Sequence, residues 1–190
     1  MKISVKTKIL QKCCRIKSKS IISHVSQNRV KGLQKLYATK ERSLADMPVV
    51  KISRNVCKEI LHTVGSQPPE SGGILLGPVG SNDVTGFFFD NCGSCTGISY
   101  SPDCTTLKQK MKVEWLPAGV DMKGFVHSHP GRLDGLSVGD MIYINRLLDI
   151  NDDMPMFIAP IVIPQEFRMR PIVVLRDKPR MPREARLDVF

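Results

Sequence analysis

The sequence lacks long apolar runs, and its first quarter has almost no acidic residues. No apolar stretch approaches the roughly 18–20 residues of a membrane-spanning helix, and no charged start leads into an apolar secretory segment. The six cysteines stand at irregular spacing, unlike those of a secreted disulfide framework. We therefore expect a cytoplasmic protein in a reducing setting, stabilised by a core and not by disulfides.

The composition is that of a globular protein. The 190 residues are 42% hydrophobic and 24% charged, so the chain is long enough to bury a core and too apolar to be disordered throughout. We find no internal repeat in the sequence. These features predict one domain, at most with an appendage.

The net charge of +10 belongs entirely to the N-terminal quarter. Residues 1–45 hold 12 Lys and Arg and a single acidic residue, Glu41, whereas the rest of the chain holds 16 basic and 17 acidic residues. We expect residues 1–46 to form a basic, flexible extension. Two alternatives stay open: a targeting segment or an arm that binds nucleic acid or an anionic surface through residues 1–45, and a natural start at Met47.

Beyond residue 48, strand and helix patterns alternate. The expected strands cover Val49–Ile52 and residues 70–77, 83–89, 123–127, 156–163 and 170–175. The expected helices begin after the N-cap Ser53 and cover residues 105–115 and 138–148, with a loop at 91–103. This alternation predicts an α/β domain with a central sheet over residues 47–178, followed by a polar C-terminal tail at 179–190.

One short segment contains the residues that indicate a chemical function. His127 and His129 stand two apart, so an extended strand points both imidazoles to the same face, and Pro130 ends that strand. After six residues, Ser137 opens the next helix with Asp140 in its first turn. Two imidazoles and one carboxylate form a three-ligand set, which is typical of catalytic zinc sites because it leaves one position open.

Each part of this segment also has a purely structural interpretation. A His-x-His pair on a strand occurs by chance, and Ser137-x-x-Asp140 is also a helix-capping arrangement in which the carboxylate favours the positive end of the helix. The joint occurrence of these elements, with Glu70 upstream beside an apolar strand, favours a metal site.

This pattern resembles the JAMM motif of the JAMM/MPN metallopeptidases, which has an upstream Glu, His-x-His-Pro, six residues and Ser-x-x-Asp. The counterparts here are Glu70, His127, His129, Pro130, Ser137 and Asp140. The stretch Glu-Ser-Gly-Gly-Ile-Leu-Leu-Gly at residues 70–77 also resembles the Glu-bearing strand of the prokaryotic branch. The resemblance covers roughly residues 49–175 and does not extend to the N-terminal segment.

The resemblance implies an MPN (JAMM, cytidine-deaminase-like) fold, with a mixed central β-sheet flanked by helices. It implies one Zn²⁺ per chain, bound by His127, His129 and Asp140. It further implies Glu70 as the general base for a zinc-activated water and Ser137 as a hydrogen-bond donor to the developing oxyanion.

The implied activity is hydrolysis of a peptide or isopeptide bond in a protein or peptide substrate. The chain after the motif is short, so we expect no insertion of the kind that binds ubiquitin in other family members. This favours the C-terminal tail of a ubiquitin-like or sulfur-carrier protein as substrate. The alternative is a non-catalytic MPN scaffold that binds a partner protein.

The cysteines do not indicate a second zinc site. Cys92, Cys95 and Cys104 are three thiols without a fourth ligand in the usual spacing, so we interpret them as incidental. Nucleoside-deaminase chemistry is disfavoured as well, because its His-x-Glu and Pro-Cys-x-x-Cys signatures are absent.

Overall fold

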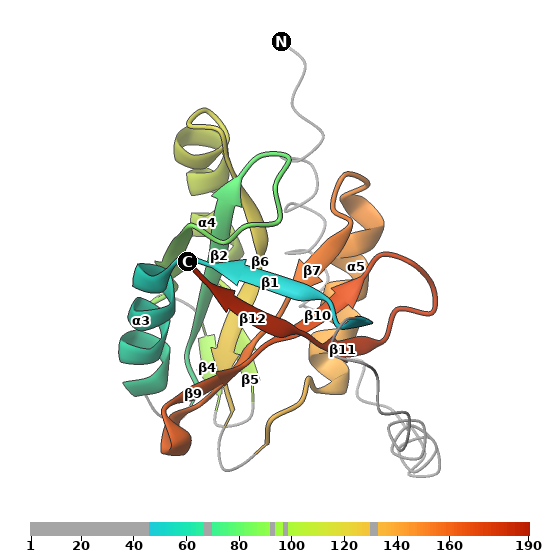
Figure 1. The fold of residues 1–190 in the computed structure, drawn as a ribbon. Helices are drawn as coiled ribbons and strands as arrows, with labels where there is room; N and C mark the ends of the chain where they lie inside the picture. Colours follow the sequence, from blue (N-terminus) through green and yellow to red (C-terminus); the bar gives the residue numbers. More distant parts are fainter. Residues whose placement is uncertain (1–45, 67–69, 92–93, 97–98, 130–132) are drawn as a thin grey trace.

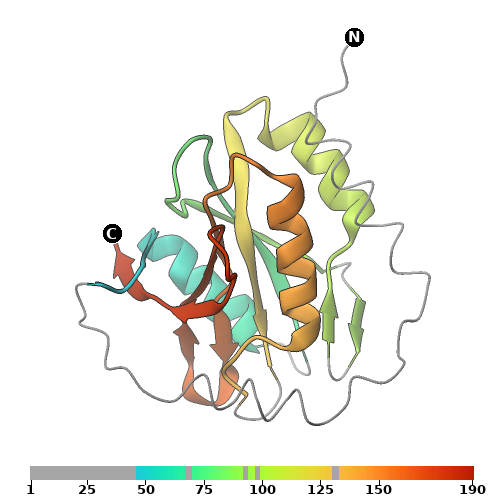
Figure 2. The ribbon, with the colours of Figure 1, turned by 90° about the vertical axis from the view of Figure 1, so that its right-hand side faces the viewer.

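The protein is built around one mixed β-sheet with helices on both faces (Figures 1 and 2). The computed structural model describes residues 46–66, 70–91, 94–96, 99–129 and 133–190. The expected extension at 1–46, apart from its last residue, lies outside the described residues, as do Pro130 and Cys92. The expected α/β class, with a mixed sheet flanked by helices, is confirmed.

The helices and strands follow in an α/β order. They are β1 (Val49–Ile52), α3 (Arg54–Thr63), η2 (Val64–Ser66), β2 (Gly72–Pro78), β3 (Gly86–Phe89), β4 (Ser94–Thr96), β5 (Ser99–Ser101), α4 (Cys104–Lys110), η3 (Met111–Trp115), β6 (Val120–Ser128), α5 (Val138–Ile150), β7 (Met156–Ile158), β8 (Ile161–Ile163), η4 (Pro164–Glu166), β9 (Arg168–Arg170), β10 (Ile172–Leu175), β11 (Pro182–Glu184) and β12 (Arg186–Val189).

Strand β6 occupies the middle of the main sheet. The strand order is β11-β10-β7-β6-β2-β3, and β8 pairs with β6 on one edge and with β9 on the other. β6 runs antiparallel to β2 and parallel to β7 and β8. Partners on both edges hold the backbone of β6 in place along most of its length.

Two cores lie on opposite faces of the sheet, because successive residues of a strand point to opposite sides. Ile74 and Phe125 join the core under α4, η3 and α5. Leu75 and Val126, the next residues along the same strands, join the core under α3, β1 and β12. The near-continuous apolar runs of these central strands follow from burial on both faces.

The helix starts match the capping signals in the sequence. The Ser53 hydroxyl accepts a hydrogen bond from the Val56 N–H at the start of α3, and Ser137 caps α5. The helical pattern at 105–115 forms α4 and then η3, a π-helical turn in which Leu116 N–H bonds to the Met111 carbonyl. None of the helices among the described residues is long and apolar enough to cross a membrane.

Two segments differ from the expectation. Residues 179–190, expected as a tail, supply β11, which pairs antiparallel with β10, and β12, which pairs parallel with β1. Both pairings are made with distant parts of the chain, so the local polar pattern carries no signal for them. The expected loop at 91–103 contains the β4–β5 hairpin.

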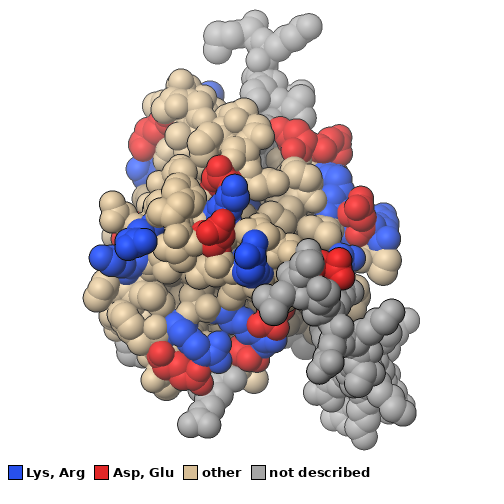
Figure 3. All heavy atoms as spheres, in the orientation of Figure 1, with Lys and Arg blue, Asp and Glu red and all other residues tan. Residues whose placement is uncertain are grey.

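Charged side chains of both signs are interspersed on the face seen in Figure 3. Ion pairs among the described residues include Arg180 with Asp149, 2.6 Å apart, and Lys110 with Glu114, 3.1 Å apart. This mixture agrees with the near-zero charge of the chain beyond residue 45.

Gly124 is required where β6 and β7 approach each other. A Cβ at this position would lie 1.7 Å from the Ile158 carbonyl oxygen, so the two strands would have to separate. We expect Gly124→Ala to lower the free energy of unfolding by about 3 kcal/mol and the melting temperature by roughly 6–12 °C, measured by thermal denaturation. Gly65→Ala is the control, because its Cβ would make an ordinary 3.5 Å contact with Val162; an equal effect of both changes would contradict this explanation.

Candidate metal centre

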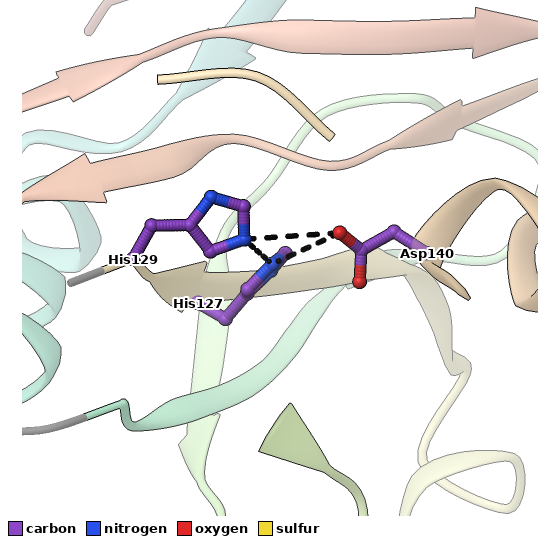
Figure 4. A group of neighbouring side chains, drawn as sticks. All are labelled: His127, His129 and Asp140. Atoms are coloured by element: carbon purple, nitrogen blue, oxygen red, sulfur yellow. Dashed lines mark hydrogen bonds and ion pairs between the residues drawn. The ribbon is translucent and has the colours of Figure 1, made fainter. Parts of the chain in front are cut away.

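The two histidines extend from the end of the central strand. His127 pairs with Gly72 of β2 on one edge and with Ile161 of β8 on the other, and its side chain is 2% exposed. It points to the same face as Phe125, whose ring centroid lies 5.3 Å from its own. His129, two residues later, is also buried and faces it, so both imidazoles lie on the side of the sheet that α5 covers (Figure 4).

Asp140 reaches the imidazoles from the first turn of α5. Its backbone N–H donates to the Ser137 hydroxyl over 3.1 Å, and its Oδ2 accepts from the Ser137 N–H over 2.7 Å, which completes a capping box. Ile144, Leu147 and Leu148 anchor the helix in the core. The cap fixes the side chain and the core fixes the helix, so the carboxylate is directed at the end of β6.

The three side chains form a compact group. His127 Nε2 and His129 Nε2 are 2.8 Å apart, and Asp140 Oδ2 lies 3.5 Å from the first and 3.7 Å from the second (Figure 4). Among the described residues, this is the group of potential metal ligands that the structure brings together. The sequence-predicted ligand set is therefore assembled in space.

Glu70, two residues before β2, interacts electrostatically with His129 and Asp140 of this group. Its side chain is 4% exposed, and within the described part of the chain its Oε2 has no hydrogen-bond partner. Burial raises the pKa of the Glu70 carboxyl; the charge of His129 opposes this increase and that of Asp140 adds to it. A buried carboxylate with an unused oxygen, in electrostatic contact with two of the three potential ligands, is suited to hold a water or move a proton.

A pair of serines joins the Glu70 segment to the histidine-bearing end of β6. Ser71 N–H donates to the Ser128 hydroxyl over 3.1 Å, and Ser128 N–H donates to the Ser71 carbonyl over 2.9 Å. The Ser71 hydroxyl also donates to the Val64 carbonyl over 3.1 Å, so η2 is attached to the same point. Sequence reasoning missed this role, although Ser128 between two histidines must point to the opposite face.

The protonation states suit cation binding. Burial would raise the pKa of the Asp140 carboxyl, but hydrogen bonds from His127, His129 and Ser137 hold it well below its usual value. Burial lowers the pKa of His127, although Asp140 opposes this decrease. An ionised carboxylate and a neutral imidazole are the forms that bind a metal ion.

The geometry is compatible with a zinc ion. Ligand atoms about 2.0–2.1 Å from a tetrahedral zinc lie roughly 3.3–3.5 Å from one another. The two distances to Asp140 Oδ2, 3.5 and 3.7 Å, are close to that separation. The imidazole nitrogens, at 2.8 Å, would have to move apart slightly on exchanging their hydrogen bond for a metal bond. His129 Nδ1, which is buried without a hydrogen-bond partner among the described residues, leaves Nε2 as the nitrogen facing the site.

The other residues singled out in the sequence lie in different settings, and some lie outside the described residues. Ser137 is exposed at the N-terminus of α5, one helical turn before Asp140. Cys104 is buried in α4 and belongs to no metal-ligand group among the described residues. Pro130, Cys92 and the side chain of Cys95 lie outside what the structure describes.

Comparisons with known proteins yield structural similarity alone. No family model and no curated protein sequence matches this chain. A similar solved structure is that of protein DSY2949 from Desulfitobacterium hafniense, with 22% identity, a TM-score of 0.50, and coverage of 74% of this chain and 92% of that one. Another is AF2198, a JAB1/MPN domain protein from Archaeoglobus fulgidus, with 21% identity, a TM-score of 0.44, and coverage of 75% of this chain and 98% of that one. At 22% identity, the first similarity concerns the fold and not the activity.

Removal of the Asp140 carboxylate tests the ligand set. We expect Asp140→Ala to weaken zinc binding by at least about 100-fold, because one of three ligands is lost. The measurements are zinc per chain after purification without added metal and a chelator-competition titration. Asp149→Ala is the matched control, since this exposed carboxylate on the same helix pairs with Arg180 and should leave zinc binding unchanged. Equal zinc content in wild type and Asp140→Ala would remove Asp140 from the ligand set.

Proposed function

We propose that this protein is a zinc-dependent hydrolase of peptide or isopeptide bonds, of the JAMM type. The observation that carries the proposal is the convergence of His127, His129 and Asp140 beside Glu70, whose buried Oε2 has no hydrogen-bond partner among the described residues. A structural metal site would be complete with protein ligands alone, whereas three ligands and a neighbouring carboxylate suit activation of a water.

When bound, zinc supplies Lewis-acid chemistry, which lowers the pKa of water from about 15.7 to about 7 and polarises a carbonyl oxygen. His127, His129 and Asp140 hold the ion. Glu70 accepts a proton from the attacking water and returns it to the leaving nitrogen, so that amide and water become carboxylate and amine. Burial raises the pKa of the Glu70 carboxyl, which favours uptake of the first proton, because a more basic carboxylate accepts a proton more readily.

Ser137 has two compatible roles in this proposal. Its oxygen accepts the Asp140 N–H in the capping box, and a hydroxyl that accepts in this way keeps its own proton to donate. That proton is directed to the carbonyl oxygen of the substrate, where negative charge develops during attack.

The substrate we propose is the C-terminal tail of a ubiquitin-like or sulfur-carrier protein. The support is the short connection after the motif: α5 ends at Ile150 and β7 begins at Met156, which leaves no room for an added substrate-binding domain. An extended tail needs only a strand edge and a groove for recognition.

Ferrous iron and a non-catalytic role are the competing assignments. Two histidines and one carboxylate also form the facial set of iron oxygenases, and a scaffold would not require a metal. Elemental analysis separates these cases, because zinc near one per chain supports the hydrolase, iron supports an oxygenase, and no metal retained or taken up on reloading supports the scaffold.

Substitution of Glu70 separates its proposed role from metal binding. We expect Glu70→Gln to keep its zinc and lose about 10²–10⁴ in kcat, because the ligands stay while proton transfer is lost. The assay is release of new termini from tail-bearing substrates, with zinc content measured on the same samples. Glu59→Gln, an exposed change in α3, is the control. Near-normal turnover by zinc-loaded Glu70→Gln would refute the assignment.

A paired substitution separates helix capping from catalysis at Ser137. Ser137→Ala and Ser53→Ala each remove a serine cap, and each should cost about 0.5–2 kcal/mol of stability. Only Ser137→Ala should also reduce kcat, by about 10²–10³, because only Ser137 adjoins a proposed metal ligand, Asp140. Thermal denaturation and turnover are measured in parallel, and equal turnover in the two variants would leave Ser137 with capping alone.

A further inference from the structure

A groove of about 600 Å³ lies directly beside the proposed site and is not used by the metal centre or by Glu70. One wall is the segment immediately before Ser137, and the other is formed by β9, β10 and β11. The lining residues are Asp134, Gly135, Leu136, Arg170, Ile172, Pro182, Arg183 and Glu184. Since Leu136 precedes Ser137 in the chain, one end of the groove reaches the site.

The strand wall of the groove includes an unpaired edge. β9 pairs with β8, which in turn pairs with β6 at His127 and Ser128. β11 pairs with β10 as far as Glu184, and the Ala185 N–H still bonds to the Pro171 carbonyl. The chain then leaves, because the Arg186 N–H bonds to the Pro48 carbonyl and β12 joins β1. Within the described residues no strand covers the outer edge of β9. Such an edge presents backbone groups that can pair with an added strand.

Arg170 bridges the two walls of the groove. Its guanidinium lies 2.6 Å from Asp134 Oδ2, donates to the Asp134 carbonyl over 3.3 Å, and lies 3.3 Å from Glu184 Oε2. These contacts link the segment before Ser137 to β9 and β11. Because the two walls are joined without a ligand, little further ordering is needed on binding.

The chemistry of the lining fits a polypeptide. Two arginines and two acidic residues leave the groove without net charge, which disfavours the polyanionic backbone of a nucleic acid. Apolar side chains of Leu136, Ile172 and Pro182 stand beside the charged ones, so both apolar and polar side chains of a peptide find contacts. The floor near Gly135 is open, since a Cβ there would meet nothing within 4 Å.

We propose that this groove binds the polypeptide substrate in an extended conformation, between the segment that leads to Ser137 and the strand wall of β9, β10 and β11. The proposal rests on the proposed function for the identity of its ligand, because the bound chain is the one cleaved. Arg170 acts here as a positioning residue that links the two walls.

Gly135 provides a direct test, because it lines the groove and a Cβ there would meet no other atom within 4 Å. The full zinc-loaded chain is given a random pool of peptides of about ten residues. We expect Gly135→Ala to behave as wild type and Gly135→Trp to raise KM about tenfold with unchanged zinc content. Val113→Trp, an exposed change in η3 at the opposite end of β6, is the size-matched control and should have no effect.

Photo-crosslinking provides a readout that does not need turnover. p-Benzoylphenylalanine is incorporated at position 135 and, as control, at position 113, and peptide capture from the same pool is measured by mass spectrometry. Stronger capture of peptide at position 135 than at position 113 supports the groove proposal, whether or not the peptide is cleaved. If peptide is captured but zinc-loaded wild type does not cleave it, the proposed function is refuted and the groove proposal is not. Equal capture at both positions, or cleavage unaffected by Gly135→Trp, overturns the groove proposal.

Discussion

The pairing of β6 along both edges is the constraint on which the rest of the structure depends. β2 on one side and β7 with β8 on the other hold its backbone, and the close approach at Gly124 leaves no room for adjustment. The histidines extend from the end of this strand, so their backbone positions are set before any ligand is present. A site built on such a strand loses little entropy when it takes up an ion.

Glu70 and Asp140 are positioned through contacts that depend on β6 and its histidines. Ser71 and Ser128 join the Glu70 segment to the strand by reciprocal hydrogen bonds. Asp140 arrives on α5, and its capping box with Ser137 holds the same carboxylate oxygen that faces the imidazoles. A helix cap, which by itself is a local stabilising device, therefore also orients a potential metal ligand, and this explains why the structural and functional interpretations of Ser137-x-x-Asp140 do not exclude each other.

The β-sheet ends differently on the two sides of the candidate site. On the Glu70 side, β2 is covered by β3, and Asp90 at the end of β3 accepts the Asp103 N–H that begins α4. On the other side, the chain leaves the main sheet after β11, and β12 pairs with β1. Among the described residues no strand pairs with the outer edge of β9, and Arg170 links this strand to Asp134 near the candidate metal centre.

The sequence by itself determined the local parts: the alternation that directs His127 and His129 to one face, the caps at Ser53 and Ser137, and the position of Asp140 in the first turn of α5. These follow from periods of two and of 3.6 residues and from hydrogen bonds between near neighbours, which a sequence displays directly. The approach of Glu70 to the imidazoles was suggested only by resemblance, and the Ser71–Ser128 and Arg170–Asp134 contacts and the strands of residues 182–189 were not indicated at all. Only the tertiary structure decided these, because each joins segments far apart in the chain, and such pairings depend on the packing of the whole sheet, which leaves no local pattern in the sequence.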